Sequence, residues 1–190
     1  MKVLLLDNYD SFTYNLKLLI EQYGVEQLDV IKNDQLQIDE VEEYDKIMLS
    51  PGPGLPSDAG LMLDIIHAYG ASKPILGICL GQHAIAEGFG GKLFNLKQAM
   101  HGITMPIKIL KEDLLFDSLP KTIEVGLYHS WAVSKDLLPE SLEILALNEK
   151  GTIMALRHKS LNIKGVQFHP ESIMTPSGKT IIWNWLNEAV

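Results

Sequence analysis

Short apolar runs alternate with helical patterns through the first half of this chain, and that alternation constrains its fold more than any other feature. Each run is the length of a buried strand, and each helical pattern places apolar residues on one face. Strands are expected at residues 2–6, 26–31, 46–49 and 74–78, and helices at 11–23, 61–69 and 80–87. Gly24, Gly70 and Gly88 follow or end the helices. The pattern predicts an α/β fold with a mostly parallel central sheet and helices on both faces.

The second half of the chain has a different pattern. Short strand candidates follow one another closely, at residues 104–110, 122–125, 142–147, 152–157 and 163–168. Such spacing favours antiparallel additions to the sheet. Residues 177–187 are expected to close the chain as a helix, with Ser177 as a cap and Trp183 and Leu186 on the inner face.

Composition limits the class of protein. The chain has 190 residues, enough for one compact domain spanning 1–190, and a single cysteine, which excludes an internal disulfide. The net charge of −8 argues against a nucleic-acid partner, and no Lys/Arg cluster stands out in the sequence. No apolar run is long enough to span a bilayer, and the N-terminus lacks a cleavage signal. We therefore expect a cytoplasmic protein without a membrane partner.

The single cysteine, Cys79, lies where the run "PILGI" passes into a helical pattern. In open α/β sheets, ligands and reacting groups gather at the carboxyl ends of strands. The first N–H groups of the following helix, that of Leu80 among them, have no partner within the helix, so they can stabilise a thiolate and an oxyanion. Gly77 and Gly81 permit a sharp turn. A buried structural thiol is the alternative interpretation.

The segment "GVQFHPES" supplies a base for this thiol. His169 and Glu171 are two residues apart, so in an extended segment they share a face, and Pro170 favours that extension. An imidazole oriented by a carboxylate is the general-base unit of acyl-transfer enzymes. Taken alone, the pair also suits a strand-end histidine beside a surface carboxylate. No pair of cysteines and no His-x₃-His spacing supports a zinc site.

The loop "SPGPG" follows the strand expected at 46–49. Its prolines stiffen the backbone and its glycines expose N–H groups, so it can present amides to a developing oxyanion. A plain surface turn is the other interpretation.

Together, "LLLDNYDSFTYNL", "LSPGPGLPSDAG", "GICLG", "MHG", "YHS" and "GVQFHPESIMT" carry a family resemblance over nearly the whole chain. The chain resembles the class I (triad) glutamine amidotransferases, and among them the amidotransferase subunits of anthranilate synthase and of aminodeoxychorismate synthase. The resemblance implies a flavodoxin-like fold with Cys79 as nucleophile, His169 as base and Glu171 as its orienting group. It also implies the following neighbours of bound glutamine: Gly52, Pro53, Gly54, Ser130 and Trp131, with Gly54 and Leu80 at the oxyanion.

One position departs from the family pattern. Members usually read "CLGHQ", with the glutamine contacting the substrate, whereas this chain reads "CLGQH". The exchange assigns the substrate contact to His83 and turns Gln82 about 100° away around the helix. An imidazole can still donate one hydrogen bond, and it can carry charge near neutral pH. We therefore expect an effect on glutamine affinity that depends on pH.

The resemblance implies that ammonia from L-glutamine passes to a chorismate-binding synthase subunit, component I. Anthranilate is the first expected product and aminodeoxychorismate the alternative. No metal or cofactor is expected in this chain, and magnesium belongs to the partner. Two other classes stay open: another cysteine hydrolase, and a non-catalytic regulatory subunit. Polar residues at the end of the first strand lie at the same sheet edge as Cys79 and are candidate partner contacts: Asp7, Asn8, Tyr9, Asp10 and Ser11.

Overall fold

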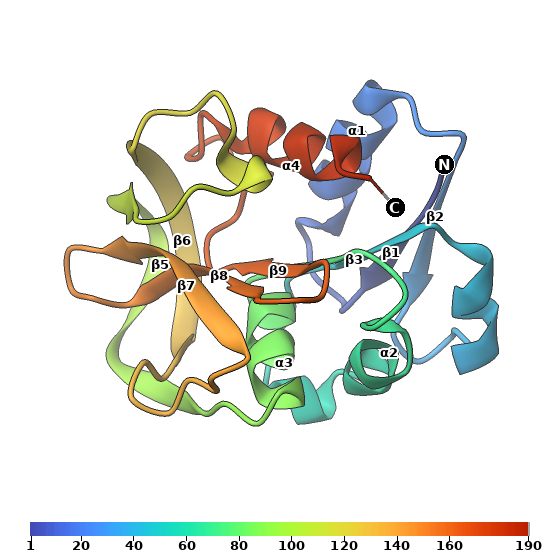
Figure 1. The fold of residues 1–190 in the computed structure, drawn as a ribbon, viewed down its shortest axis with the longest axis horizontal. Helices are drawn as coiled ribbons and strands as arrows, with labels where there is room; N and C mark the ends of the chain where they lie inside the picture. Colours follow the sequence, from blue (N-terminus) through green and yellow to red (C-terminus); the bar gives the residue numbers. More distant parts are fainter. Residues whose placement is uncertain (190) are drawn as a thin grey trace.

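A nine-stranded sheet in the order β2-β1-β3-β4-β9-β8-β7-β5-β6 forms the middle of the computed structural model, which describes residues 1–189 (Figure 1). The strands are β1 Lys2–Asp7, β2 Gln27–Lys32, β3 Lys46–Leu49, β4 Ile75–Ile78, β5 Leu93–Ile109, β6 Thr122–Val133, β7 Leu142–Asn148, β8 Ile153–His158 and β9 Ile163–Val166. The α-helices are α1 Thr13–Tyr23, α2 Met62–Tyr69, α3 Leu80–Gly88 and α4 Gly178–Asn187. Short 3₁₀ helices are η1 Ile38–Glu43, η2 Pro56–Asp58 and η3 Leu114–Phe116.

The parallel half of the sheet follows the predicted alternation. Strands β2, β1, β3, β4 and β9 pair in parallel in that order. Helices α1 and α4 cover one face, and α2 and α3 cover the other (Figure 1). Apolar side chains that alternate along β1 pack into two separate cores, with Val3 and Leu5 in one and Leu4 and Leu6 in the other. The predicted fold class is confirmed.

Antiparallel pairing begins at β8 and extends the sheet through β7, β5 and β6. Strands β5 and β6 are much longer than predicted. The additional residues of β5 are mostly exposed, and those of β6, although mostly buried, include polar residues, so neither strand gives one continuous apolar run. The sequence pattern predicts residues 163–168 as one of the antiparallel strands. In the structure β9 pairs in parallel with β4 and antiparallel with β8, so it joins the two halves. All four residues of β9 are buried, as a central parallel strand requires.

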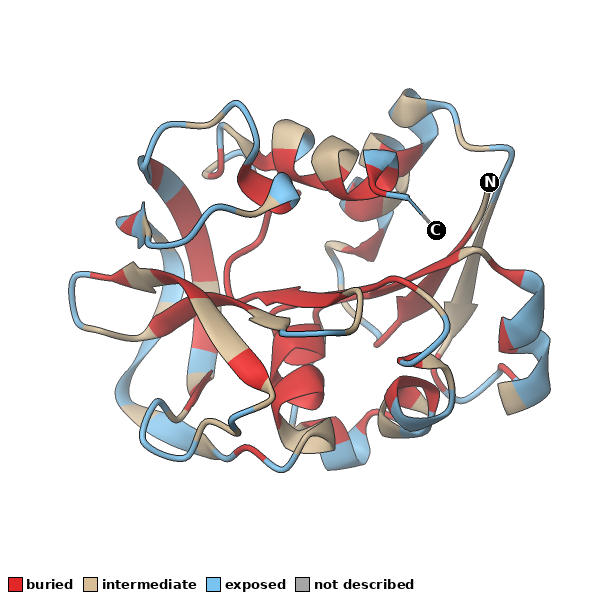
Figure 2. Cartoon of the chain, viewed as in Figure 1, coloured by how far each residue is buried: buried red, intermediate tan, exposed pale blue. Residues whose placement is uncertain are grey.

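Burial is continuous along the central strands and along α3 (Figure 2). On α4 the fully buried aromatic residue is Trp185, and Leu186 is buried beside it. Trp183 is partly buried and packs against the same core, and its Nε1 donates to the Leu19 carbonyl at 3.1 Å. The predicted inner face is therefore confirmed for Leu186 and in part for Trp183. The side chain of Ser177 makes no capping hydrogen bond. Among residues 1–189, no helix combines the length and apolarity needed to cross a bilayer.

Candidate active site

Cys79 occupies a strained turn between β4 and α3. Its φ of 51° and ψ of −98° are rare for a residue with a side chain, and such strain costs on the order of 1–3 kcal/mol. Its N–H donates to the Val166 carbonyl at 2.7 Å, which fixes the turn to β9. A Cβ added at Gly77 would lie 2.4 Å from the carbonyl carbon of Gly81, and one at Gly81 would lie 2.7 Å from the Leu49 oxygen. The two glycines therefore let helix and strand approach closely enough to form the turn.

His169 and Glu171 meet just beyond the carboxyl end of β9. His169 Nδ1 donates to Glu171 Oε1 at 2.7 Å, and both side chains are buried. The sequence pattern predicts this contact in an extended segment, but the structure forms it in a turn. Pro170 begins a turn in which the Ser172 N–H donates to the His169 carbonyl at 3.2 Å, and proline suits the second position of such a turn. The spacing of the two residues was informative, but their backbone conformation was wrongly predicted.

The rings of Phe12 and Tyr128 pack beside the His169 imidazole, with centroids 5.6 and 5.0 Å from it. Its Nε2 has no hydrogen-bond partner among the residues that the structure describes. Burial disfavours the imidazolium, but interactions with Cys79 and Glu171 outweigh burial and raise the pKa of His169 to about 10.

A cavity of about 210 Å³ opens in front of Cys79. It is lined by Gly52, Pro53, Gly54, Cys79, Leu80, His83, Tyr128, His129, Ser130 and Trp131. The structure thus brings together every residue predicted to surround glutamine, from three segments distant in the sequence. Their roles in binding stay predictions. Sequence reasoning did not single out Tyr128 and His129, although both lie in or beside the "YHS" motif.

Hydrogen bonds from Asn8, the residue after β1, hold the "SPGPG" loop in place. Asn8 Nδ2 donates to the Ser50 carbonyl at 2.8 Å, and the Asn8 N–H donates to Ser50 Oγ at 2.9 Å. A Cβ on Gly52 would lie 2.6 Å from Asn8 Cβ, so only glycine fits there. Gly54 has a φ of 76°, which glycine adopts without strain. The loop is therefore a supported wall of the cavity.

This arrangement narrows the predicted partner surface. Asp7 and Asn8 are buried, and Asp7 Oδ1 accepts a hydrogen bond from Thr13 Oγ1 at 2.9 Å. They cannot contact a partner directly, because their side chains are committed inside the molecule. Tyr9 is 51% exposed and Ser11 is exposed, while Asp10 accepts from the Phe12 N–H. The direct partner contacts that remain predicted are these last three residues, Tyr9, Asp10 and Ser11.

The exchanged pair points in two directions, as predicted. His83 lines the cavity, whereas Gln82 is fully buried against Gly165 of β9, and both polar atoms of its side chain lack partners within the described chain. The predicted charge on His83 is wrong. Burial lowers the pKa of His83 to about 4, so its imidazole is neutral at physiological pH.

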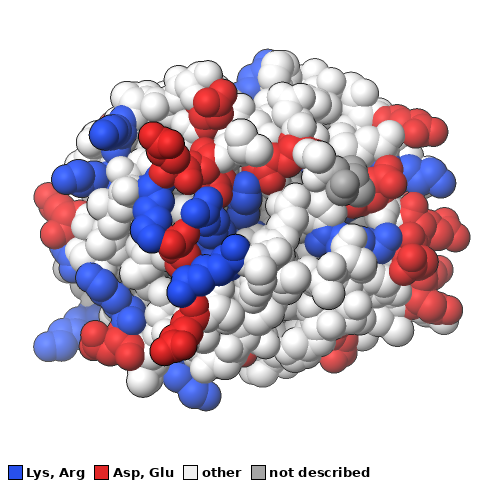
Figure 3. All heavy atoms as spheres, viewed as in Figure 1, with Lys and Arg blue, Asp and Glu red and all other residues white. Residues whose placement is uncertain are grey.

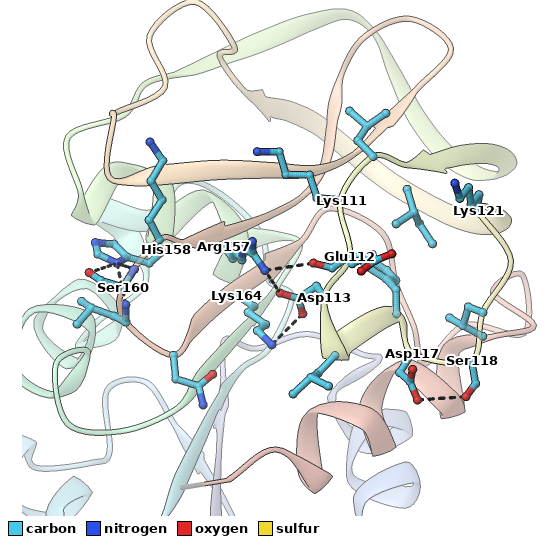
Figure 4. Close-up of a pocket in the computed structure, with 18 residues that line it drawn as sticks. Lys111, Glu112, Asp113, Asp117, Ser118, Lys121, Arg157, His158, Ser160 and Lys164 are labelled. Atoms are coloured by element: carbon cyan, nitrogen blue, oxygen red, sulfur yellow. Dashed lines mark hydrogen bonds and ion pairs between the residues drawn. The ribbon is translucent and has the colours of Figure 1, made fainter.

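A larger cavity, of about 1050 Å³, lies at the amino end of β9, away from Cys79 (Figure 4). Basic side chains distant in the sequence gather around it, which the sequence did not indicate. Arg157 pairs with Asp113 and Glu143, and Lys164 pairs with Asp113 and Glu188. The right edge of the face that Figure 3 shows is mainly acidic, whereas acidic and basic side chains are mixed over its left and middle parts. These charges offset one another, so we assign the cluster to the structure of the fold.

Within the described part of the chain, no three His, Cys, Asp or Glu side chains gather as metal ligands would. The absence of a metal from this chain's chemistry stays a prediction.

Comparison with known proteins identifies the family to which this chain belongs. A glutamine amidotransferase of known structure from Thermotoga maritima superposes with a TM-score of 0.81, at 15% identity, over 98% of this chain and 96% of its own. The sequence profile of the family "Glutamine amidotransferase class-I" matches residues 4–189, so the chain belongs to that family.

Among curated relatives, anthranilate synthase component 2 of Leptospira biflexa is 45% identical over 201 residues, covering 98% of this chain and 100% of the relative. Aminodeoxychorismate synthase component 2 of Escherichia coli (strain K12) is 42% identical over 187 residues, covering 97% and 99%. The relatives' names therefore include both amidotransferase subunits that the sequence motifs suggested.

Proposed function

We propose that this chain is the glutamine-hydrolysing subunit of a chorismate-aminating synthase, with anthranilate as the first candidate product and aminodeoxychorismate as the second. The observation that carries the proposal is the shared cavity. Cys79 opens into the same space as the "SPGPG" loop, His83, Ser130 and Trp131. This is the set of residues that would surround the side-chain amide of a bound glutamine.

Catalysis would use Cys79, His169 and Glu171 as a triad. The Cys79 thiolate attacks the carboxamide carbon of glutamine, and the oxyanion forms near Leu80 and Gly54. The C–N bond then breaks, ammonia leaves with a proton supplied by His169, and a thioester remains on Cys79. Water, deprotonated by His169, hydrolyses the thioester to glutamate and returns the thiol. Glu171 accepts the hydrogen bond from His169 Nδ1, with 2.7 Å between Nδ1 and Oε1, and so keeps Nε2 directed at the reacting groups.

Ammonia produced here would serve a second subunit that binds chorismate. Support comes from the relatives' names, which describe them as component 2 of their synthases. The exposed residues Tyr9 and Ser11, at the sheet edge next to the cavity, are the candidate contacts. Magnesium, if the synthase requires it, belongs to the partner subunit, and a cytoplasmic location suits such a complex.

The proposal is tested by copurifying the chain with the chorismate-binding subunit encoded in the same genome, then supplying glutamine and chorismate. We expect glutamate and a single aminated product, whose identity by mass spectrometry decides between the two candidates. A diazo-ketone analogue of glutamine should label Cys79 alone, because it is the only cysteine. Labelling without any aminated product would indicate another cysteine hydrolase. Amination supported only by free ammonia would indicate a regulatory subunit.

A further inference from the structure

The side-chain amide of Gln167 connects two groups of the proposed site. Its Oε1 lies 2.8 Å from His83 Nε2, and its Nε2 lies 3.6 Å from Cys79 Sγ. Gln167 is fully buried and does not line the cavity, so it lies behind the sulfur as seen from the substrate side. Its backbone is fixed as well, because its N–H donates to the Met154 carbonyl at 2.9 Å.

The polarity of this chain of contacts follows from the atoms. A carboxamide oxygen only accepts hydrogen bonds, so His83 must donate from Nε2. Neutral His83 has one N–H. The Trp131 carbonyl also lies beside its ring, but only the contact with Gln167 has hydrogen-bond geometry, so we place the N–H on Nε2. Both hydrogens of the Gln167 amide then lie on its nitrogen, and that nitrogen is the atom facing Sγ. The amide is thereby oriented as a donor toward sulfur.

The other ionisable groups around the thiol come from three elements. His169 and Glu171 follow β9, His129 belongs to β6, and His83 belongs to α3. His129 Nδ1 donates to the Trp131 carbonyl at 2.8 Å, so its Nε2 carries no proton in the neutral ring and offers none to sulfur. Among these side chains, Gln167 is the neutral hydrogen-bond donor that faces Cys79 Sγ from the side away from the cavity.

We propose that Gln167 is a catalytic residue that donates a hydrogen bond to the Cys79 thiolate, and that His83 is the positioning residue that orients it. The inference rests on the proposed function, because it assigns the thiolate as the reacting species. A donor fixed before the reaction stabilises negative charge on sulfur without reorganisation. It also gives the "CLGQH" order a consequence. His83, which faces the substrate cavity, is hydrogen-bonded to Gln167, the donor to the Cys79 thiolate.

The test measures the rate at which iodoacetamide alkylates Cys79 as pH is varied, using the full-length chain. The reading is unambiguous because the chain has one cysteine. Gln167→Met keeps the length of the side chain and removes the donor. Hydrogen bonds to charged groups are strong enough that we expect alkylation at neutral pH to slow by roughly tenfold or more, with the midpoint of the profile moved to higher pH. Gln82→Met is the matched control, since it changes the other buried glutamine of the site region, whose amide has no partner, and should leave the profile unchanged.

A second pair of variants tests the role of His83. His83→Leu removes the donor to Gln167 and should slow alkylation by less than Gln167→Met does. His83→Gln restores a side-chain N–H and should recover most of the rate. Gln167→Glu, which replaces the donor by an acceptor, should slow alkylation further than Gln167→Met and serves if the methionine variant does not fold. Wild-type profiles in folded Gln167→Met or Gln167→Glu would overturn the proposal. Alkylation requires no glutamine turnover, so failure here is distinct from failure of the glutaminase proposal, which absent glutamine hydrolysis would show.

Discussion

Gly77→Ala should damage the site by displacing the turn that carries Cys79, although it touches no reacting atom. The new Cβ would meet the carbonyl carbon and oxygen of Gly81 at 2.4 Å and Ile85 Cδ1 at 2.7 Å. Two of these atoms are backbone atoms, so no rotamer change relieves the contact. Carbon atoms pack at about 3.5–4.0 Å, so the amino end of α3 must move by about 1 Å relative to β4.

The expected cost has two parts. Overpacking of this kind destabilises a protein by roughly 1–3 kcal/mol. For a chain of this size, each kcal/mol lowers the melting temperature by about 2–4 °C. Displacement of the nucleophile by about 1 Å can reduce turnover by roughly 10²-fold. Activity should therefore fall far more than the loss of folded protein explains.

The assay pairs thermal unfolding with steady-state glutamine hydrolysis in the complex, at a temperature where the variant is folded. Gly88→Ala is the control at the other end of the same helix. Its Cβ would meet only the Ile66 side chain closely, at 3.2 Å, and alanine favours helices, so stability should change by less than about 1 kcal/mol and activity should be retained. Gly77→Ala with wild-type turnover would show that the close approach at Gly77 does not position Cys79.

Three further predictions follow from the site. Glu171→Gln removes a group that raises the pKa of His169, so the alkaline limb of the kcat/KM profile should move to lower pH. Turnover should also fall, but less than in His169→Ala. Loss of general-base catalysis in His169→Ala should reduce turnover by roughly 10²–10⁴-fold. An unmoved limb in Glu171→Gln contradicts the assignment. The double change Gln82→His with His83→Gln should alter the glutamine KM by up to about tenfold. Because His83 is neutral, its titration should not raise the wild-type KM as pH falls across the neutral range. An equal KM in both proteins would show that His83 does not contribute to glutamine binding. The free chain should hydrolyse glutamine slowly and the synthase subunit should accelerate it, with Tyr9→Ala weakening the acceleration; identical rates with and without the partner would refute the coupling.

The sequence predicted the parallel half of the fold well, because buried strands and glycine-ended helices leave local patterns. The strand at residues 46–49 has the same limits in the structure as in the prediction. The long strand β5 was recognised only in part. Its first portion is exposed and is ordered by pairing with β6, a long-range contact without a local apolar pattern. The α4 helix was recognised with Trp183 and Leu186 on the side that packs against the core, but the fully buried Trp185 was not singled out.

The site was predictable to the extent that single residues carry it. Cys79, with glycines on both sides, required a close turn, and the structure contains one. The His169–Glu171 contact was expected from spacing, although a turn at Pro170 produces it. Gln167 was not found, because its importance depends on contacts with residues 79 and 83 that only the fold creates. The charge of His83 was wrong for the same reason, since a sequence does not give burial.

We propose that Cys79 releases ammonia from glutamine and that a partner subunit consumes it. The most direct test is Cys79→Ser in the complex with the chorismate-binding subunit, comparing amination of chorismate from glutamine with amination from added ammonium salt. Serine keeps the size of the side chain. Ser134→Ala is the control variant, because Ser134 lies outside the cavity lining. We expect Cys79→Ser to abolish the glutamine-dependent reaction and to leave the ammonia-dependent reaction at the wild-type rate. Glutamine-dependent amination by Cys79→Ser at the wild-type rate would contradict the role of Cys79 as the nucleophile.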